Sequence, residues 1–121
     1  MHIKTILYIF LLWGICFSSF AGNRKGEKEY VIVANQSLAR SPEWSEVINY
    51  LCEQHEAEVV YYLNSPSEVK EKLQRLRPRY VAFVERPEQI GVQYVLRVNR
   101  MSREIDEDIY VDFRWGIITG Y

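Results

Sequence analysis

Cys52 and His55 are the one thiol–imidazole pair in the chain whose spacing could support nucleophilic chemistry. They lie three residues apart in a segment with helical periodicity, so they share one face on adjacent turns. A thiol activated by an imidazole is a common nucleophile. Both residues, however, fall on an apolar stripe, where free cysteine packs as a small hydrophobe. We therefore interpret them as packing residues and predict no catalytic residue and, with only two ligands of this kind, no zinc site.

An acidic segment near the C-terminus is the second group of residues that could carry a function. It contains Asp106, Glu107, Asp108 and Asp112. Oxygen-rich segments can hold calcium, but this one lacks the loop glycine and the twelfth-position glutamate of an EF-hand. A solvated run of charges is the simpler interpretation. We predict no metal and keep Asp108 and Asp112 as candidate binding residues.

Three loops follow the expected strands, and they are the natural place for a site. In open α/β sheets, ligands bind beyond the carboxyl ends of the strands. The loops are residues 35–37, 64–65 and 85–87. By position alone they nominate Asn35, Glu85 and Arg86 as binding residues, although turn formation would also account for these residue types.

Motifs for a nucleotide cofactor are absent from the sequence. No Gly-x-Gly-x-x-Gly follows the first expected strand, and no P-loop lysine motif occurs anywhere. Without the first 21 residues, 14 basic and 16 acidic side chains remain, a net charge of −2. This balance argues against a nucleic acid or an anionic membrane surface as the partner, since either needs a concentrated basic face. We predict no cofactor.

The elements that would position these residues alternate between strand and helix. Residues 30–34 and 79–84 are short runs apolar on both faces, as in strands buried between two helical layers. Residues 57–63 predict the strand between them in the chain. Ile109 to Tyr121 alternates loosely and is a candidate for a fourth strand.

Helices are expected after each of the first three strands. Ser41-Pro42 and Ser65-Pro66 predict two helix starts, because a hydroxyl can cap free amides and proline suits the first helical position. Glu68 completes a capping box with Ser65. A third apolar stripe runs through Ile90, Tyr94, Val98, Met101 and Ile105. We expect that helix to end near Ser102, because the acids that follow are unfavourable at a helix C-terminus.

This order predicts an α/β fold, specifically a three-layer open parallel sheet of three or four strands with flanking helices, a Rossmann-like or caspase-like half. Strands apolar on both faces need cover on both sides, and three helices supply it thinly. We therefore expect residues 30–121 to form a single α/β domain that is truncated at the C-terminus. The alternative is a complete small domain with its last strand at the sheet edge.

Residues 1–21 have the layout of a signal peptide. Lys4 precedes an apolar run, and Ser19-Phe20-Ala21 provides a small-x-small exit. We predict cleavage near Ala21, a polar connector over residues 22–29, and a secreted or periplasmic product that retains only Cys52 and so forms no internal disulfide. Two alternatives remain open: an uncleaved anchor, although the run of about 15 residues is short for a bilayer, and lipidation of Cys16, although Ile15 precedes it.

Several segments together resemble the early part of the gingipain-like cysteine peptidases. They are Tyr30-Val31-Ile32-Val33, Glu58-Val59-Val60, Arg77 to Val84, Asp108 to Phe113, and Trp115-Gly116-Ile117. The resemblance implies a caspase-like α/β sheet and an exported bacterial product. The family's catalytic histidine and cysteine lie in a His-Gly context and a small-residue–Cys context, neither of which occurs here. It therefore implies no catalytic residue, and it implies a structural role for Asp108, Tyr110 and Asp112.

The sequence thus predicts an exported α/β domain that resembles the N-terminal part of a gingipain-like peptidase and is non-catalytic as it stands, with the missing C-terminal part of that domain as its partner. The alternative is a small complete secreted module that recognises a protein or glycan with its strand-end loops. A third hypothesis is a domain tethered to the membrane only through an uncleaved leader.

Overall fold

The computed structural model describes residues 28–108 and 110–120, so the expected leader and most of the connector lie outside the described residues. Four strands are present: β1 (Tyr30–Asn35), β2 (Glu58–Tyr62), β3 (Tyr80–Val84) and β4 (Arg114–Ile118). Three α-helices connect them: α2 (Pro42–His55), α3 (Lys70–Leu76) and α4 (Val92–Met101). Short 3-10 helices precede them: η1 (Gln36–Arg40), η2 (Pro66–Val69) and η3 (Pro87–Gln89).

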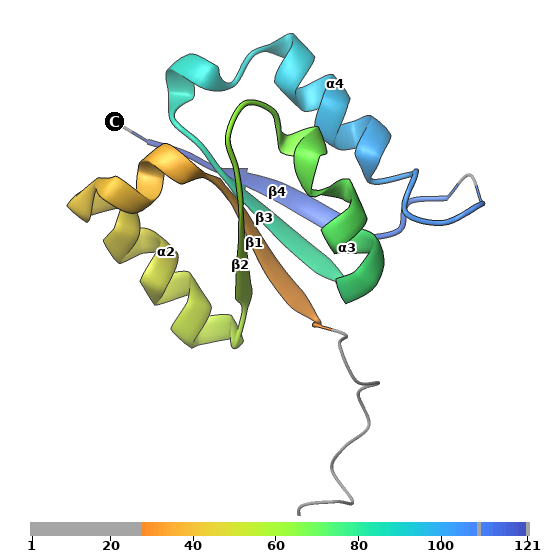
Figure 1. Ribbon diagram of the computed structural model, residues 1–121, viewed down its shortest axis with the longest axis horizontal. Coiled ribbons are helices and arrows are strands. Elements are labelled where there is room, and N and C mark those ends of the chain that lie inside the picture. Colours follow the sequence, from red (N-terminus) through yellow and green to blue (C-terminus); the bar gives the residue numbers. More distant parts are fainter. Residues whose placement is uncertain (1–27, 109, 121) are drawn as a thin grey trace, which may run out of the picture.

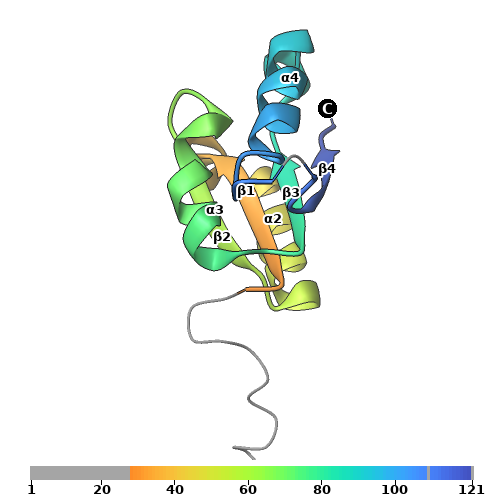
Figure 2. The same ribbon diagram turned by 90° about the vertical axis from the view of Figure 1, so that its right-hand side faces the viewer.

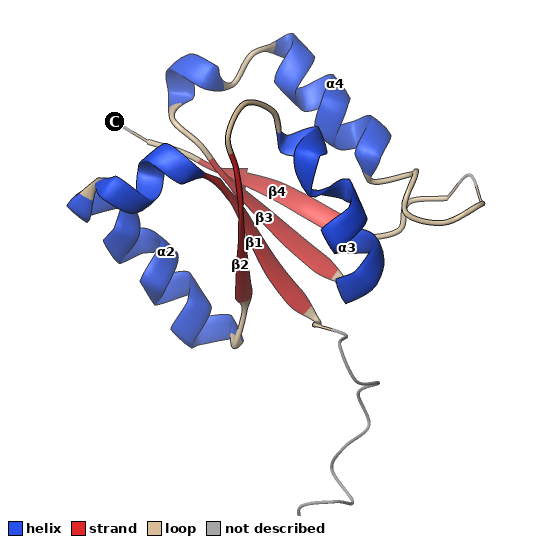
Figure 3. Cartoon of the chain, in the orientation of Figure 1, coloured by secondary structure: helices blue, strands red, loops and turns tan. Residues whose placement is uncertain are grey.

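The strands form one parallel sheet in the order β2-β1-β3-β4 (Figure 1). In the register of the sheet, Val33 of β1 lies between Val60 of β2 and Phe83 of β3. Helix α2 covers one face, and α3 and α4 cover the other (Figures 2 and 3). The predicted three-layer α/β fold is confirmed. The strand order matches the first four places of a doubly wound sheet. The chain adds β2 on one side of β1 and then β3 and β4 on the other side, so the order of the strands reverses between β1 and β3.

Two apolar cores lie on the two faces of the sheet. Alternate residues of β1 divide between them: Val31 and Val33 pack beneath α3 and α4, whereas Ile32 and Ala34 pack beneath α2. All four side chains are fully buried. The expectation of strands apolar on both faces is therefore confirmed for β1 and β3, because each row of their side chains has a helical layer to pack against.

The helix boundaries follow most of the predicted signals. The Ser65–Glu68 capping box is present, although it opens the 3-10 turn η2 and α3 begins only at Lys70. Helix α4 ends at Met101, next to the predicted Ser102. Among residues 28–108 and 110–120, every helix is too short or too polar to cross a bilayer.

The prediction for the start of α2 is wrong in one respect. Ser41 is the N-cap residue and Pro42 takes the first helical position, but the Ser41 side chain makes no capping hydrogen bond. The hydroxyl that forms a hydrogen bond between η1 and α2 belongs to Ser45, which donates to the Ala39 carbonyl oxygen at 2.9 Å. The apolar face of α2 is also narrow. Only Ile48 of this helix is fully buried, and His55, which lies on the predicted apolar stripe, is exposed.

Candidate functional site

The carboxyl ends of β1, β2 and β3 meet at one edge of the sheet and form the candidate site. The chain leaves β1 toward the α2 face and leaves β3 toward the α4 face, so the two loops diverge around a crevice. This reversal point is where open α/β sheets bind ligands. The expected loops are therefore in the expected place.

Glu85 is the central residue of this edge. It follows β3 directly and is only 1% exposed. Its Oε2 accepts a hydrogen bond from the Tyr62 hydroxyl at 2.5 Å, and its Oε1 accepts one from the backbone N–H of Arg86 at 2.8 Å. Both oxygens of this side chain therefore act as hydrogen-bond acceptors.

Tyr94 extends this arrangement into a chain of hydroxyls. The hydroxyl oxygens of Tyr62 and Tyr94 are 3.2 Å apart. Because Tyr62 has a single hydroxyl proton and donates it to Glu85, Tyr94 is the donor to Tyr62. The oxygen of Tyr94 is then free to accept another hydrogen bond.

Both phenols of this chain are held in the neutral form. Burial, followed by the hydrogen bond to Glu85, raises the pKa of Tyr62 well above its ordinary value. Burial is also the main cause that raises the pKa of Tyr94, to about 12. At neutral pH the two tyrosines are therefore hydrogen-bond donors rather than bases.

Asn35 and Arg86 fix the shape of the two flanking loops. The side-chain Oδ1 of Asn35 accepts from the Ser37 backbone N–H at 3.0 Å, which starts η1. The Arg86 guanidinium donates from Nη1 to Ser37 Oγ at 2.8 Å and so links the loop after β3 to the loop after β1. Arg86 therefore points to Ser37, and within the described part of the chain Glu85 forms no ion pair.

A cavity of about 270 Å³ opens on these groups. Glu85, Tyr62 and Tyr94 all line it. Further along its wall lie the amide side chains of Asn35, Asn64, Gln89 and Gln93. Glu88 and Arg97 add two exposed charges. The cavity is thus large enough for a small molecule or one side chain, and it is lined largely by groups that can form hydrogen bonds.

The Cys52–His55 pair lies at the other edge of the sheet. The His55 ring stacks on the Tyr30 ring, with the centroids 4.1 Å apart and the planes within 4°. Tyr30 begins β1, so the C-terminal end of α2 lies beside the amino end of the sheet. Burial, together with the charge of Glu53, raises the pKa of the Cys52 thiol. Neither residue contributes to the cavity at the strand ends.

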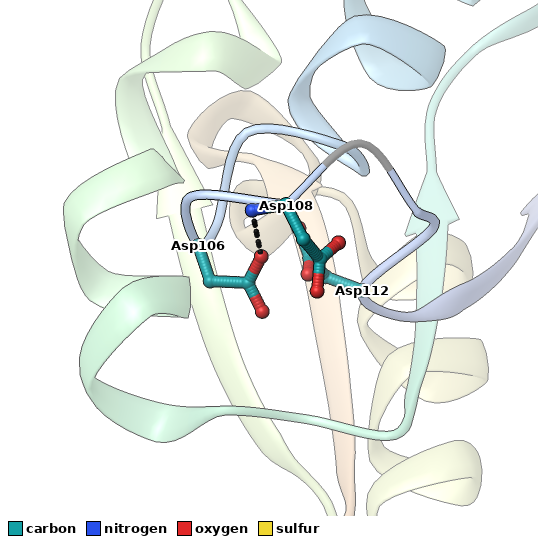
Figure 4. Close-up of side chains that lie close together, drawn as sticks. All are labelled: Asp106, Asp108 and Asp112. Carbon is teal, nitrogen blue, oxygen red and sulfur yellow. Dashed lines mark hydrogen bonds between the residues drawn. The ribbon is translucent and has the colours of Figure 1, made fainter.

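The acidic candidates also lie at the amino edge. Asp108 and Asp112 belong to the loop between α4 and β4, and their carboxylate oxygens lie within 4.8 Å of each other and of those of Asp106 (Figure 4). Hydrogen bonds within the loop hold them: the Asp108 backbone N–H donates to Asp106 at 2.9 Å, and Asp112 accepts from the Ile105 N–H at 2.9 Å. Burial is the leading cause of a raised pKa at Asp112.

The five predicted binding residues therefore divide into two groups. Asn35, Glu85 and Arg86 meet at the carboxyl edge, whereas Asp108 and Asp112 do not approach them. The predicted binding residues do not include Tyr62, which lies in an expected strand, or Tyr94, which lies on an expected helix stripe. The rule that nominated Glu85 could have found Tyr62, since this tyrosine is the last residue of β2.

No family model, curated protein or solved structure matches this chain. The kinship with gingipain-like peptidases therefore stays a prediction. The function is inferred from the geometry of the carboxyl edge.

Proposed function

We propose that this chain is an exported, non-catalytic α/β binding domain that takes a polar group into the cavity at the ends of β1, β2 and β3. The observation that carries the proposal is the buried carboxylate of Glu85, which lines an open cavity at the reversal point of the sheet. Burying a carboxylate costs several kcal/mol, on the order of the whole stability of a small domain. Such a group is often retained for function.

The chemistry of the cavity favours binding over catalysis. Its phenols have raised pKa values and are poor bases at neutral pH. The thiol and the imidazole of the described chain lie at the opposite edge. What remains is a set of hydrogen-bond donors and acceptors, which can orient a ligand.

The polar lining suits the partners that a secreted module meets. Amide side chains, carboxylates and tyrosines form directional hydrogen bonds with sugar hydroxyls and with polar protein side chains. A volume of about 270 Å³ limits the occupant to one such group at a time. We therefore propose recognition of a single residue of a larger partner or of a small free ligand.

A panel of small polar compounds tests the proposal by NMR. The full chain as exported is labelled with ¹⁵N and titrated with amines, carboxylates, amides and monosaccharides. The backbone amide signals of Asn35, Asn64 and Arg86 should shift together for at least one class. Shifts confined to other parts of the surface, or no shifts from the whole panel, would contradict a binding role for this cavity.

A second candidate follows from the resemblance, namely a non-catalytic part of a gingipain-like peptidase domain. The observation that favours it is the edge strand β4, which pairs with β3 on one side only. Its Trp115, Ile117 and Ile118 are only partly buried, and Ile118 lines a mainly apolar cavity of about 330 Å³ with Trp44 and Val47. A further strand and helix supplied by a partner segment would cover these residues.

Thermal unfolding of the isolated product separates the two candidates. A cooperative transition from a monomer favours a self-sufficient binding domain. Aggregation, or a compact state without fixed side-chain packing, favours a sheet that needs another segment beside β4. The NMR titration is independent of this result, because no residue of β4 lines the cavity.

A further inference from the structure

We infer that the ligand of the cavity carries a primary ammonium group, which binds the carboxylate of Glu85. This inference rests on the proposed function and adds the chemical class of the ligand. The observation behind it is a buried negative charge that no positive charge of the described chain neutralises. Buried charges in proteins are usually paired with an opposite charge.

The partners of Glu85 satisfy its hydrogen bonding only in part. Tyr62 and the Arg86 backbone N–H occupy one acceptor position on each oxygen. A carboxylate offers about four such positions, so about two remain. Both present donors are neutral, and Arg86 directs its guanidinium to Ser37 instead. The site therefore supplies hydrogen bonds but leaves the charge for a ligand to neutralise.

An ammonium group fits the acceptors around Glu85. It has three N–H donors and needs three acceptors. One is Glu85, and the second is the oxygen of Tyr94, whose own proton is used on Tyr62. Asn35 and Asn64 line the same cavity, and the side-chain oxygen of either can supply the third.

Other ligand classes fit less well. An anion would meet the charges of Glu85 and Glu88. A divalent metal needs several oxygen or nitrogen ligands, and in the described residues the one group of three acidic ligands is at Asp106, at the other edge.

Two sources could bring a primary ammonium group: a free α-amino acid, or a lysine side chain of a protein. Arg97 distinguishes them, because it also lines the cavity and makes no ion pair within the described chain. A free amino acid places a carboxylate close to its ammonium group, whereas a lysine side chain does not. The presence of Arg97 favours the amino acid.

Ligand pairs of matched size test the inference with the full chain. Ethylammonium and ethanol have the same number of non-hydrogen atoms and differ in charge. Glycine and Nα-acetyl-lysine amide represent the two sources. The measured quantities are the NMR shifts of the Asn35, Asn64 and Arg86 amides and the dissociation constants obtained from them.

We expect ethylammonium to bind and ethanol to leave these amides unshifted. Glu85→Gln should weaken the binding of ethylammonium about 10-fold or more, because it removes a charged hydrogen bond. The matched control is Glu46→Gln, an exposed change on α2 that should leave the binding constant unchanged. If the ligand is a free amino acid, Arg97→Gln should weaken the binding of glycine and leave the binding of ethylammonium unchanged. An unchanged glycine affinity in this variant, with binding of the lysine compound, assigns the lysine source.

Two results would overturn the inference, and they are distinguishable from a failure of the proposed function. Equal shifts from ethanol and ethylammonium, or binding only of carboxylates or sugars, would remove the ammonium assignment and leave a binding cavity. No shift from any compound of the whole panel would remove both. If Glu85→Gln does not fold, the comparison of ethylammonium with ethanol on the unchanged protein still decides.

Discussion

The hydroxyl of Tyr62 donates a hydrogen bond to Glu85, and these two residues lie at the ends of strands that are not neighbours. Tyr62 ends β2 and Glu85 follows β3, while β1 lies between the two strands in the sheet. The hydrogen bond therefore crosses the end of the central strand. It joins residues 23 positions apart in the sequence, and both residues line the cavity.

Tyr62→Phe should destabilise the protein more than Tyr94→Phe. The first change removes the donor to Glu85 and the acceptor for Tyr94, whereas the second leaves the Tyr62–Glu85 hydrogen bond in place. We expect a loss of about 2–3 kcal/mol in the free energy of unfolding for Tyr62→Phe and about 1 kcal/mol for Tyr94→Phe. Urea unfolding followed by circular dichroism measures both, and equal losses would contradict the order of donors.

Alkaline pH should unfold the protein through the same tyrosines. Because the pKa of Tyr94 is raised to about 12 in the folded state, the folded state keeps its proton where the unfolded chain loses it. The associated stability is complete below the ordinary tyrosine pKa of about 10 and is lost as the pH rises toward 12. We expect about 1–2 kcal/mol less stability at pH 11 than at pH 8. Tyr94→Phe should reduce this difference, and a pH-independent unfolding curve over this range would refute the assignment.

Glu68 should make the loop after β2 sensitive to acid. Its carboxylate accepts from the backbone N–H groups of Ser65, Asn64 and Leu63, and these hydrogen bonds lower its pKa. The stability that they provide is present above the ordinary glutamate pKa and is lost as the pH falls through the lowered value. Glu68→Gln should therefore lower the melting temperature at pH 7 by more than it does at pH 3.

Glu71→Gln is the matched control for this loop. Glu71 is a neighbouring exposed glutamate in the first turn of α3. Glu71→Gln should lower the melting temperature at pH 7 by less than Glu68→Gln does. Identical pH profiles of the melting temperature for the two variants would count against the capping role of Glu68.

Peptide hydrolysis should be absent. The Cys52 thiol has a raised pKa, which disfavours the reactive thiolate. The neighbouring His55 ring stacks on the Tyr30 ring. We expect no turnover of arginyl, lysyl or neutral peptide substrates by the exported chain, and none by Cys52→Ala. Cleavage that disappears in Cys52→Ala would overturn the non-catalytic assignment.

Export should remove the leader. Expression with the leader intact, followed by mass spectrometry of the secreted or periplasmic product, should give a chain that begins at Gly22. Ala21→Asp should block or move the cut, because the last position before cleavage requires a small residue. A membrane-bound product of full length would support the uncleaved anchor instead.

The fold was predictable from local patterns because each signal is carried by a short segment. The apolar runs gave β1, β2 and β3, and the Ser65–Glu68 capping box gave the start of η2. The acidic residues after Ser102 correctly marked the end of α4. Ser41 misled the prediction because its hydroxyl makes no capping hydrogen bond. The Ser45 hydroxyl instead donates to the Ala39 carbonyl oxygen, a contact that depends on the three-dimensional path of η1.

The site was only half predictable, since it depends on contacts between distant segments. Position after a strand identified Asn35, Glu85 and Arg86, and the structure brings them together. Tyr94 carried no such signal, because it lies on a helix stripe whose pattern is the same for packing and for function. The grouping of Asp108 with the other candidates lacked a spatial argument, and the structure separates them.

The central strand β1 determines how freely the binding cavity can move. Its residues Val31 to Ala34 are fully buried and hydrogen-bonded to strands on both sides, so their amides should be among the slowest in the molecule to exchange with deuterium. Asn35, at the end of this strand, lines the cavity. A ligand would therefore find part of its wall already rigid, and little of its binding energy would be spent on ordering that segment.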